Sequence, residues 1–274
     1  MKRKLCMLLI PFLGLSFQLK AQGDLLVTPT RVVFEGNAQK EELNIVNKGR
    51  DTAVYSISFL QYRMKEDGSF ETIDKPDSGQ MFADPYLRIF PRKVTLAPEE
   101  PQVIALQLRK KPDMLPGEYR SHIYFRAEKK VNPLGLGKTA NDTTTLKVEL
   151  TPIFGVSIPV LIHTGAVSST ASLSDLKLKT EQDTNQFINF VLHREGNISL
   201  YGDFTIQFIP TDGKAYDVGK VKGVAVYTNI TKRNVSIKLN KVPGKSFKNG
   251  KLRLQYVSPD TAKSAVYAEA ELSL

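Results

Sequence analysis

Apolar and polar residues alternate with a period of two in short segments along most of this sequence. The pattern is clearest at Ile104, Leu106 and Leu108, and it returns between Tyr119 and Ala127. Successive side chains of a β-strand point to opposite faces, so the pattern predicts strands with one apolar face. No segment shows helical periodicity over three turns, and turn residues such as Asp67-Gly68 separate the segments. Strands at this spacing predict a β-sandwich.

The alternating segments fall into two groups, which predict two domains. The first group contains the strand candidates at residues 25–34, 42–47, 53–62, 102–109 and 118–127. Alternation then resumes after a small, polar stretch that is typical of an interdomain linker. We therefore expect an all-β fold, two immunoglobulin-like β-sandwich domains in tandem. The expected boundaries are an N-terminal domain at residues 22–163, a linker at 164–172 and a C-terminal domain at 173–274.

The first 21 residues are predicted to be a secretory signal peptide. A basic start, Lys2-Arg3-Lys4, precedes an apolar run too short to span a membrane, and Ala21 offers a cleavage site. The only cysteine, Cys6, lies in this leader, so the mature chain is expected to have no disulfide and no thiolate chemistry. Removal of the leader would lower the formal charge from +10 to +6. The remaining basic residues form no dense run, which argues against a nucleic-acid partner.

Residues 143–162 (TTTLKVELTPIFGVSIPVLI) are predicted to form a long strand at the edge of the first domain. Leu146, Val148 and Leu150 make an apolar row, and the residues between them are polar. Prolines interrupt the run, and proline is tolerated mainly at sheet edges and bulges. Residues 129–142, which lead into the strand, are predicted to be a surface loop. Two interpretations of the apolar row are open. It fills the core of its own domain, or it pairs with another protein through a strand edge that has little protection against such pairing.

The sequence contains no recognisable constellation of catalytic or metal-binding residues, so we expect neither an enzyme nor a cofactor. His122 and His193 fall within alternating segments, where a structural role is the expected one. Residues 193–195 (HRE) resemble part of a zinc deaminase signature, but no cysteine pair completes it. Residues 134–139 (LGLGKT) end like a phosphate-binding loop, but Asn132 stands where the first glycine is needed.

Four segments of the first domain resemble, in the same order, the motifs of one protein family. They are residues 30–36 (TRVVFEG), 44–47 (NIVN), 91–103 (PRKVTLAPEEPQV) and 115–121 (LPGEYRS). In these segments the chain resembles the N-terminal domain of the PapD-like periplasmic pilus (fimbrial) assembly chaperones, as a divergent branch. The resemblance covers roughly residues 25–163, and the second domain resembles the family only in size and pattern.

The resemblance implies a function for the edge strand. Family members bind incomplete pilus subunits and lend their own G strand, which inserts alternate apolar side chains into the open groove of the subunit. The lent residues here would be Leu146, Val148 and Leu150. Arg31 matches the family's arginine that holds the terminal carboxylate of the subunit, and a planar guanidinium suits that task. The family pairs this arginine with a lysine, whose position is occupied here by Phe154 or a neighbour.

The resemblance further implies a periplasmic location, secreted pilus or surface-fibre subunits as partners, and an outer-membrane assembly protein as an additional partner. It implies no cofactor, no nucleic acid and no membrane-spanning segment. The alternative is a non-enzymatic β-sandwich module that has a structural or binding role in a cell-envelope or secretion assembly. Such a module would keep the fold without donating a strand, and Arg31 would be an ordinary surface arginine. The client subunits and the oligomeric state are left open.

Overall fold

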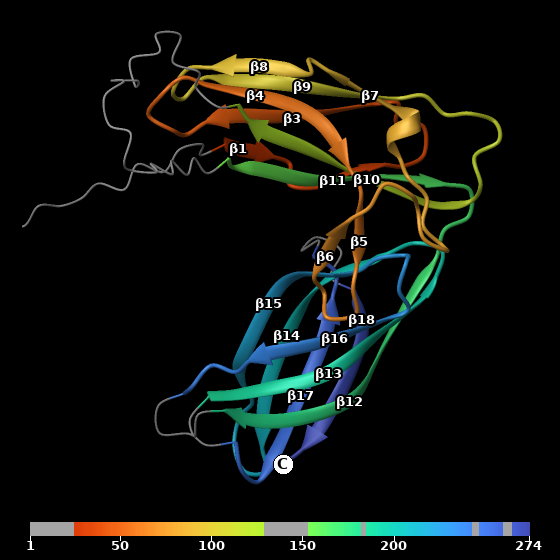
Figure 1. Cartoon of the computed structure of the whole chain (residues 1–274). Coiled ribbons are helices and arrows are strands. Elements are labelled where there is room, and N and C mark those ends of the chain that lie inside the picture. The colour runs from red at the N-terminus through yellow and green to blue at the C-terminus, as the bar shows by residue number, and fades with distance from the viewer. Residues whose placement is uncertain (1–24, 129–152, 182–184, 243–246, 260–264) are drawn as a thin grey trace, which may run out of the picture.

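The computed structural model of the chain describes residues 25–128, 153–181, 185–242, 247–259 and 265–274. These residues form two β-sandwiches, one above the other in Figure 1, with a short hairpin between them. The one helical element in the described ranges is a single 3-10 turn, η1 (Asp84–Tyr86). The predicted all-β fold of two sandwiches in tandem is therefore confirmed.

The first sandwich consists of a four-stranded and a five-stranded sheet. The four-stranded sheet has the order β1 (Leu25–Thr28), β3 (Lys40–Asn47), β9 (Pro101–Leu108) and β7 (Leu87–Phe90). The five-stranded sheet has the order β2 (Val32–Phe34), β11 (Gly155–Thr164), β10 (Gly117–Ala127), β4 (Ala53–Leu60) and β8 (Lys93–Leu96).

The first predicted strand, residues 25–34, is in fact two strands that belong to different sheets. β1 pairs with β3 in one sheet, and β2 pairs with β11 in the other, so the chain crosses the sandwich at residues 29–31. Pro29 lies in this crossing, where its lack of a backbone N–H costs no ladder hydrogen bond. The crossing places Arg31 directly before β2, which matters for the site described below.

The second sandwich has a three-stranded and a four-stranded sheet. The three-stranded sheet has the order β12 (Ser169–Glu181), β13 (Asn185–Gly196) and β16 (Lys232–Lys238). The four-stranded sheet has the order β15 (Tyr216–Val226), β14 (Leu200–Pro210), β17 (Gly250–Val257) and β18 (Val266–Ser273). The connection from the first sandwich runs from the end of β11 to the start of β12, residues 165–168, because Ser169 already pairs with Gly196.

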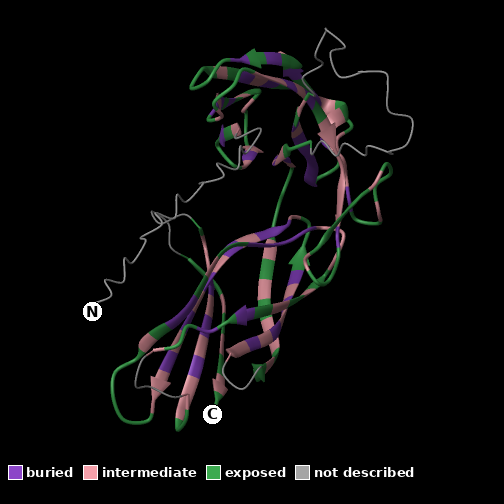
Figure 2. Cartoon of the chain, turned by 60° about the vertical axis from the view of Figure 1, so that its left-hand side comes forward, coloured by how far each residue is buried: buried purple, intermediate pink, exposed green. Residues whose placement is uncertain are grey.

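Each sandwich has its own core, built from the alternating rows that the sequence shows. Ile104, Leu106 and Leu108 of β9 point inward and are at most 4% exposed. Leu252, Leu254 and Tyr256 of β17 do the same in the second sandwich. Figure 2 shows this alternation as bands of buried and more exposed residues along the strands. Burial of these rows is the main driving force for both sandwiches.

Strand β10 departs from this pattern, because both of its faces are covered. Its core face carries Ile123 and Phe125, which are fully buried as the sequence predicts. The opposite face carries Glu118, Arg120 and His122, which the alternation would place in solvent but which are at most 5% exposed. The second sandwich covers this face, so the polar side of β10 becomes the centre of the domain interface.

A two-stranded hairpin of the first domain, β5 (Tyr62–Met64) and β6 (Phe70–Thr72), also contacts the second sandwich. Met64 is 1% exposed and packs against Tyr227. Asn229 donates a hydrogen bond to the carbonyl of Met64 (2.8 Å), and the Asn234 N–H donates to the carbonyl of Glu66 (2.7 Å). Main-chain and side-chain contacts therefore join the domains on this side as well.

Candidate functional site

The described part of the predicted edge strand is β11, and one of its edges is largely open. Along one edge β11 pairs with β10 from Gly155 to Thr164. Along the other edge it pairs only with β2, in parallel, from Val160 to Ile162. Within the ranges that the structure covers, no strand pairs with residues 155–159 on that side. Among the described residues, positions 155–159 therefore have no strand partner on this side, and such an edge can accept or donate a strand.

The inward-facing row of β11 leaves the core at this edge. Ile158, Val160 and Ile162 are at most 5% exposed and belong to the core of the first sandwich. Val156 is only partly buried against that core, and Phe154, next along the row, is 48% exposed. The carbonyl of Phe154 still accepts a hydrogen bond from the Ala127 N–H (3.0 Å), so the chain stays beside β10 to this point. The row is buried at one end and apolar but exposed at the other.

The three predicted donor residues, Leu146, Val148 and Leu150, lie outside the described residues. Phe154, which by the resemblance is at or next to the family's lysine position, is a large exposed apolar residue immediately before β11.

Arg31 lies where the two sandwiches meet. Its guanidinium carbon is 4.4 Å from the centre of the Tyr201 ring of the second sandwich, a cation–π distance. The side chain is half-buried, and in the described part of the chain no carboxylate forms an ion pair with it. Burial lowers the pKa of Arg31, and the charge of Arg120 lowers it further, with partial compensation from Glu118. Arg31 is thus a desolvated cation that has an aromatic neighbour and, in the part of the chain that the structure describes, no ion-pair partner.

A buried ion-pair network lies beside Arg31 and connects the domains. Arg120 donates to Glu118 Oε1 through Nε (2.9 Å) and Nη2 (2.7 Å), and Nη2 also donates to Ser199 Oγ (2.6 Å). Ser199 donates to Glu118 Oε2 through its N–H (3.0 Å) and its hydroxyl (2.6 Å). Burial alone would raise the pKa of Glu118, but Arg120, His163 and Ser199 outweigh it and hold this pKa far below its usual range. Glu118 is therefore a carboxylate at every physiological pH.

An aromatic cluster continues the interface beyond the network. The guanidinium carbon of Arg120 lies 3.7 Å from the centre of the Tyr227 ring. His122 Nε2 and the Tyr227 hydroxyl are 3.1 Å apart and share a hydrogen bond. The Tyr62 ring packs edge-on against His122, with ring centres 4.8 Å apart. Burial lowers the pKa of His122 to about 3, with help from Arg120 and Arg31, so this histidine is neutral. Its place in this packed interface agrees with the structural role predicted for it.

The second cation near Arg31 is Arg120, which the sequence did not single out. The strand register explains the placement: Val32 pairs with Val160, and Val160 pairs with Ser121. Residue 31, directly before β2, and residue 120, on β10, therefore reach the same face of the five-stranded sheet, two strands apart. The only sequence signal was the polar half of the β10 alternation, which has the appearance of a solvent-facing row.

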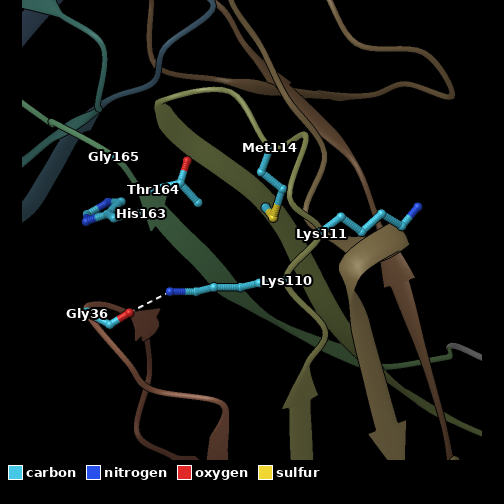
Figure 3. Close-up of a pocket in the computed structure, with 7 residues that line it drawn as sticks. All are labelled: Gly36, Lys110, Lys111, Met114, His163, Thr164 and Gly165. Carbon is cyan, nitrogen blue, oxygen red and sulfur yellow. Dashed lines mark hydrogen bonds between the residues drawn. The ribbon is translucent and has the colours of Figure 1, made fainter.

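The described residues contain no group of three or more His, Cys, Asp or Glu side chains that could hold a metal ion. A cavity of about 280 Å³ near the end of β11 is lined by Gly36, Lys110, Lys111, Met114, His163, Thr164 and Gly165 (Figure 3). Lys110 crosses it and donates to the Gly36 carbonyl, and His163 Nδ1 lies 3.1 Å from Glu35 Oε1. The Thr164 hydroxyl in its lining donates its hydrogen bond to the Leu115 carbonyl.

The described ranges also contain no helix that is long and apolar enough to cross a membrane. His193, the remaining histidine, lies on β13 and is 2.8 Å from the Ser174 hydroxyl across the strand pair. This position agrees with the structural role predicted for it.

No protein-family model matches the chain, and no curated protein matches it. Among solved structures it is similar to the YadV chaperone, with 12% identity, a TM-score of 0.46 and coverage of 92% of this chain and 100% of that chain. It is similar to the CsuC–CsuE chaperone–tip adhesion subunit pre-assembly complex from archaic chaperone-usher Csu pili of Acinetobacter baumannii (11% identity, TM-score 0.46, 91% of this chain, 98% of that chain). The CupB2 chaperone of Pseudomonas aeruginosa gives 12% identity and a TM-score of 0.44, over 91% of this chain and 100% of that chain. All three are chaperone structures, the class that the sequence resembles, but likeness at this level gives no residue of this chain a role.

Proposed function

We propose that this protein is a periplasmic chaperone that binds pilus or surface-fibre subunits and stabilises them by lending its edge strand, residues 143–162. The client would be a secreted β-sandwich protein with an incomplete sheet. The lent strand completes that sheet: backbone hydrogen bonds supply affinity, and alternate apolar side chains fill the groove. The protein needs no cofactor for this task, because binding and folding drive it. An outer-membrane assembly protein would receive the loaded complex.

The observation that carries the proposal is the apolar row of β11 that leaves the core along an unpaired edge. Ile158 is buried, Val156 is partly buried and Phe154 is exposed, so the row leaves the core at the start of β11. In an extended strand, residues separated by even numbers share a face. Leu146, Val148 and Leu150 precede Phe154 in the sequence at such spacings, and the proposal assigns them to the groove of the client.

The environment of Arg31 is a second, separate observation that supports the same proposal. Arg31 lies directly before β2, a strand of the same sheet as β11, and has no acidic partner among the described residues. Burial together with the charge of Arg120 makes its own charge costly. A carboxylate that binds Arg31 would compensate this charge through paired N–H···O bonds. The proposal assigns this role to the terminal carboxylate of the client, with the lent strand running away from the anchor.

The test is co-purification of clients with the tagged mature chain, residues 22–274, from the periplasm of its native host. Val148→Glu would put an unpaired charge into an apolar groove, at a cost of several kcal/mol. We expect it to reduce the recovered client at least about ten-fold. Thr151→Glu introduces the same charge on the opposite face of the strand, and we expect it to retain the client. Native mass spectrometry should show one client per chaperone.

Circular dichroism of both variants verifies that the sandwiches remain folded. If Val148→Glu retains the same partners as wild type, or if wild type brings down a fixed multi-protein assembly in place of one-to-one complexes, strand donation is wrong. The second of these outcomes would favour the alternative, a structural or binding module of a cell-envelope assembly.

A further inference from the structure

We infer that the carboxylate anchor is assembled by both domains: Tyr201 of the second sandwich orients the Arg31 guanidinium, and the Glu118–Arg120–Ser199 network holds Tyr201 in place. The inference rests on the proposed function, because it specifies how the anchor in that function is built. It makes Tyr201 and Ser199 positioning residues for client binding, although they belong to the domain that donates no strand.

The first step is the contact between Arg31 and Tyr201. A guanidinium is planar, and its five N–H donors all lie in that plane. The guanidinium carbon lies over the Tyr201 ring, 4.4 Å from the ring centre, so this aromatic contact fixes where the group lies. The backbone constrains the direction of the Arg31 side chain less strongly, because β2 has only three residues and begins after Arg31. The aromatic contact is therefore what selects one orientation of the side chain.

The second step is the placement of Tyr201 itself. Ser199 lies two residues earlier, so both side chains point to the same side of the extended chain that enters β14. Ser199 is held by one hydrogen bond from Arg120 and by two to Glu118, each between 2.6 and 3.0 Å. Leu200, between them, points the other way into the core of the second sandwich and is 4% exposed. The segment is therefore held from both sides, and the ring has little freedom to move.

The third step is charge. The pKa of Arg31 is shifted by the charges of four neighbouring groups, Arg120, Glu118, Tyr227 and Tyr201. Only one of them, Glu118, is a carboxylate. Glu118 already accepts two hydrogen bonds from Arg120 and two from Ser199, so it is fully engaged. The pair Arg31 and Arg120 thus carries one positive charge in excess, in a partly desolvated place where Coulomb interactions are strengthened. A single carboxylate balances that charge, which fits the end of a polypeptide chain.

The experiment measures the anchor directly, with small probes in place of a client. The mature chain, residues 22–274, is labelled with ¹⁵N-arginine, and the Arg31 Nε–Hε signal is assigned with Arg31→Lys. N-acetyl-leucine supplies a terminal carboxylate, and N-acetyl-leucinamide supplies the same side chain without it. For wild type we expect a saturable shift of the Arg31 signal with N-acetyl-leucine and none with the amide.

Tyr201→Leu removes the ring, and we expect it to raise the dissociation constant for N-acetyl-leucine about five-fold, the value of one aromatic–cation contact. Tyr201→Phe keeps the ring and should restore most of the affinity. Ser199→Ala does not alter any group that touches Arg31, yet it should weaken binding in the same direction. Tyr267→Leu is the matched control, because Tyr267 is a 42% exposed tyrosine on β18.

The outcomes separate this inference from the proposed function. If the wild-type Arg31 signal does not respond to N-acetyl-leucine, the carboxylate anchor itself is wrong. If wild type responds but Tyr201→Leu and Ser199→Ala bind as tightly as Tyr267→Leu, the anchor stands and its assembly by both domains is overturned. The Arg31 signal of the free protein gives a second measure, since loss of the Tyr201 ring current should move it even before any probe is added.

Discussion

Glu118→Ala is expected to lower the free energy of unfolding by about 3–5 kcal/mol, the cost of leaving a buried charge without its partner. Arg120 is 2% exposed in the interface, and Glu118 is the only carboxylate within the described residues that forms an ion pair with it. Removal of Glu118 also leaves both donors of Ser199 without their acceptor. Urea denaturation at pH 7, followed by far-ultraviolet circular dichroism, measures the effect.

Glu269→Ala is the control for this prediction, since Glu269 accepts a hydrogen bond from Gln255 but is 42% exposed on β18. A surface substitution of this kind should change stability by at most about 0.5 kcal/mol. The double variant Glu118→Leu with Arg120→Leu should recover most of the loss, because it removes the uncompensated charge as well. An effect of Glu118→Ala no larger than that of the control would mean that the network does not stabilise the interface.

Acid is expected to destabilise the protein well before the carboxylates titrate, because of His122. Burial lowers the pKa of His122 to about 3 in the folded protein, against an ordinary value of 6.5. Between these two values the unfolded chain binds a proton that the folded chain does not, so stability falls as the pH falls. The slope is at most about 1.4 kcal/mol per pH unit, which gives a loss of about 2 kcal/mol between pH 7 and pH 5.

The measurement compares urea midpoints of wild type and His122→Phe between pH 7 and pH 5. The phenylalanine cannot bind a proton. The free energy of unfolding of the variant should therefore fall less steeply with decreasing pH, and the difference in slope should correspond to about one bound proton. The range stops at pH 5 because Glu118 adds a second acid effect at lower pH. The pKa of Glu118 is lowered from its ordinary 4.5 in the folded protein, so its contribution to the free energy of unfolding also decreases as the pH falls. Equal slopes for the two proteins would show that His122 does not control the acid response.

The local pattern of the sequence was sufficient to predict the strands and the two cores. Ile104, Leu106 and Leu108 share a face in the alternation, and they are buried together. The segment 211–214 predicts a hairpin turn, and β14 and β15 pair on either side of it, with Gly213 at a φ of +126° that other residues rarely adopt. These features are set by residues close to one another in the chain. An extended backbone sends neighbouring side chains to opposite sides, whatever the rest of the protein does.

The sequence resemblance named Arg31, but only the tertiary structure decided what surrounds it. Glu118, Arg120 and His122 form the polar half of an alternating strand, which for a lone sandwich means a solvated face. They are buried because Ser199 and Tyr227, 81 and 105 residues away in the chain, cover them. Periodicity specifies which side chains share a face, whereas the partner of that face depends on how two domains dock.

The donor residues Leu146, Val148 and Leu150 remain predictions of the sequence, and β11 supplies the open edge and the emerging apolar row from which they would continue. Local alternation thus determined the strands, the cores and the candidate donor row. The anchor, its aromatic support and the buried ion pair depend on contacts between distant segments. Such contacts follow from strand register and domain docking, and short-range side-chain periodicity carries no information about either.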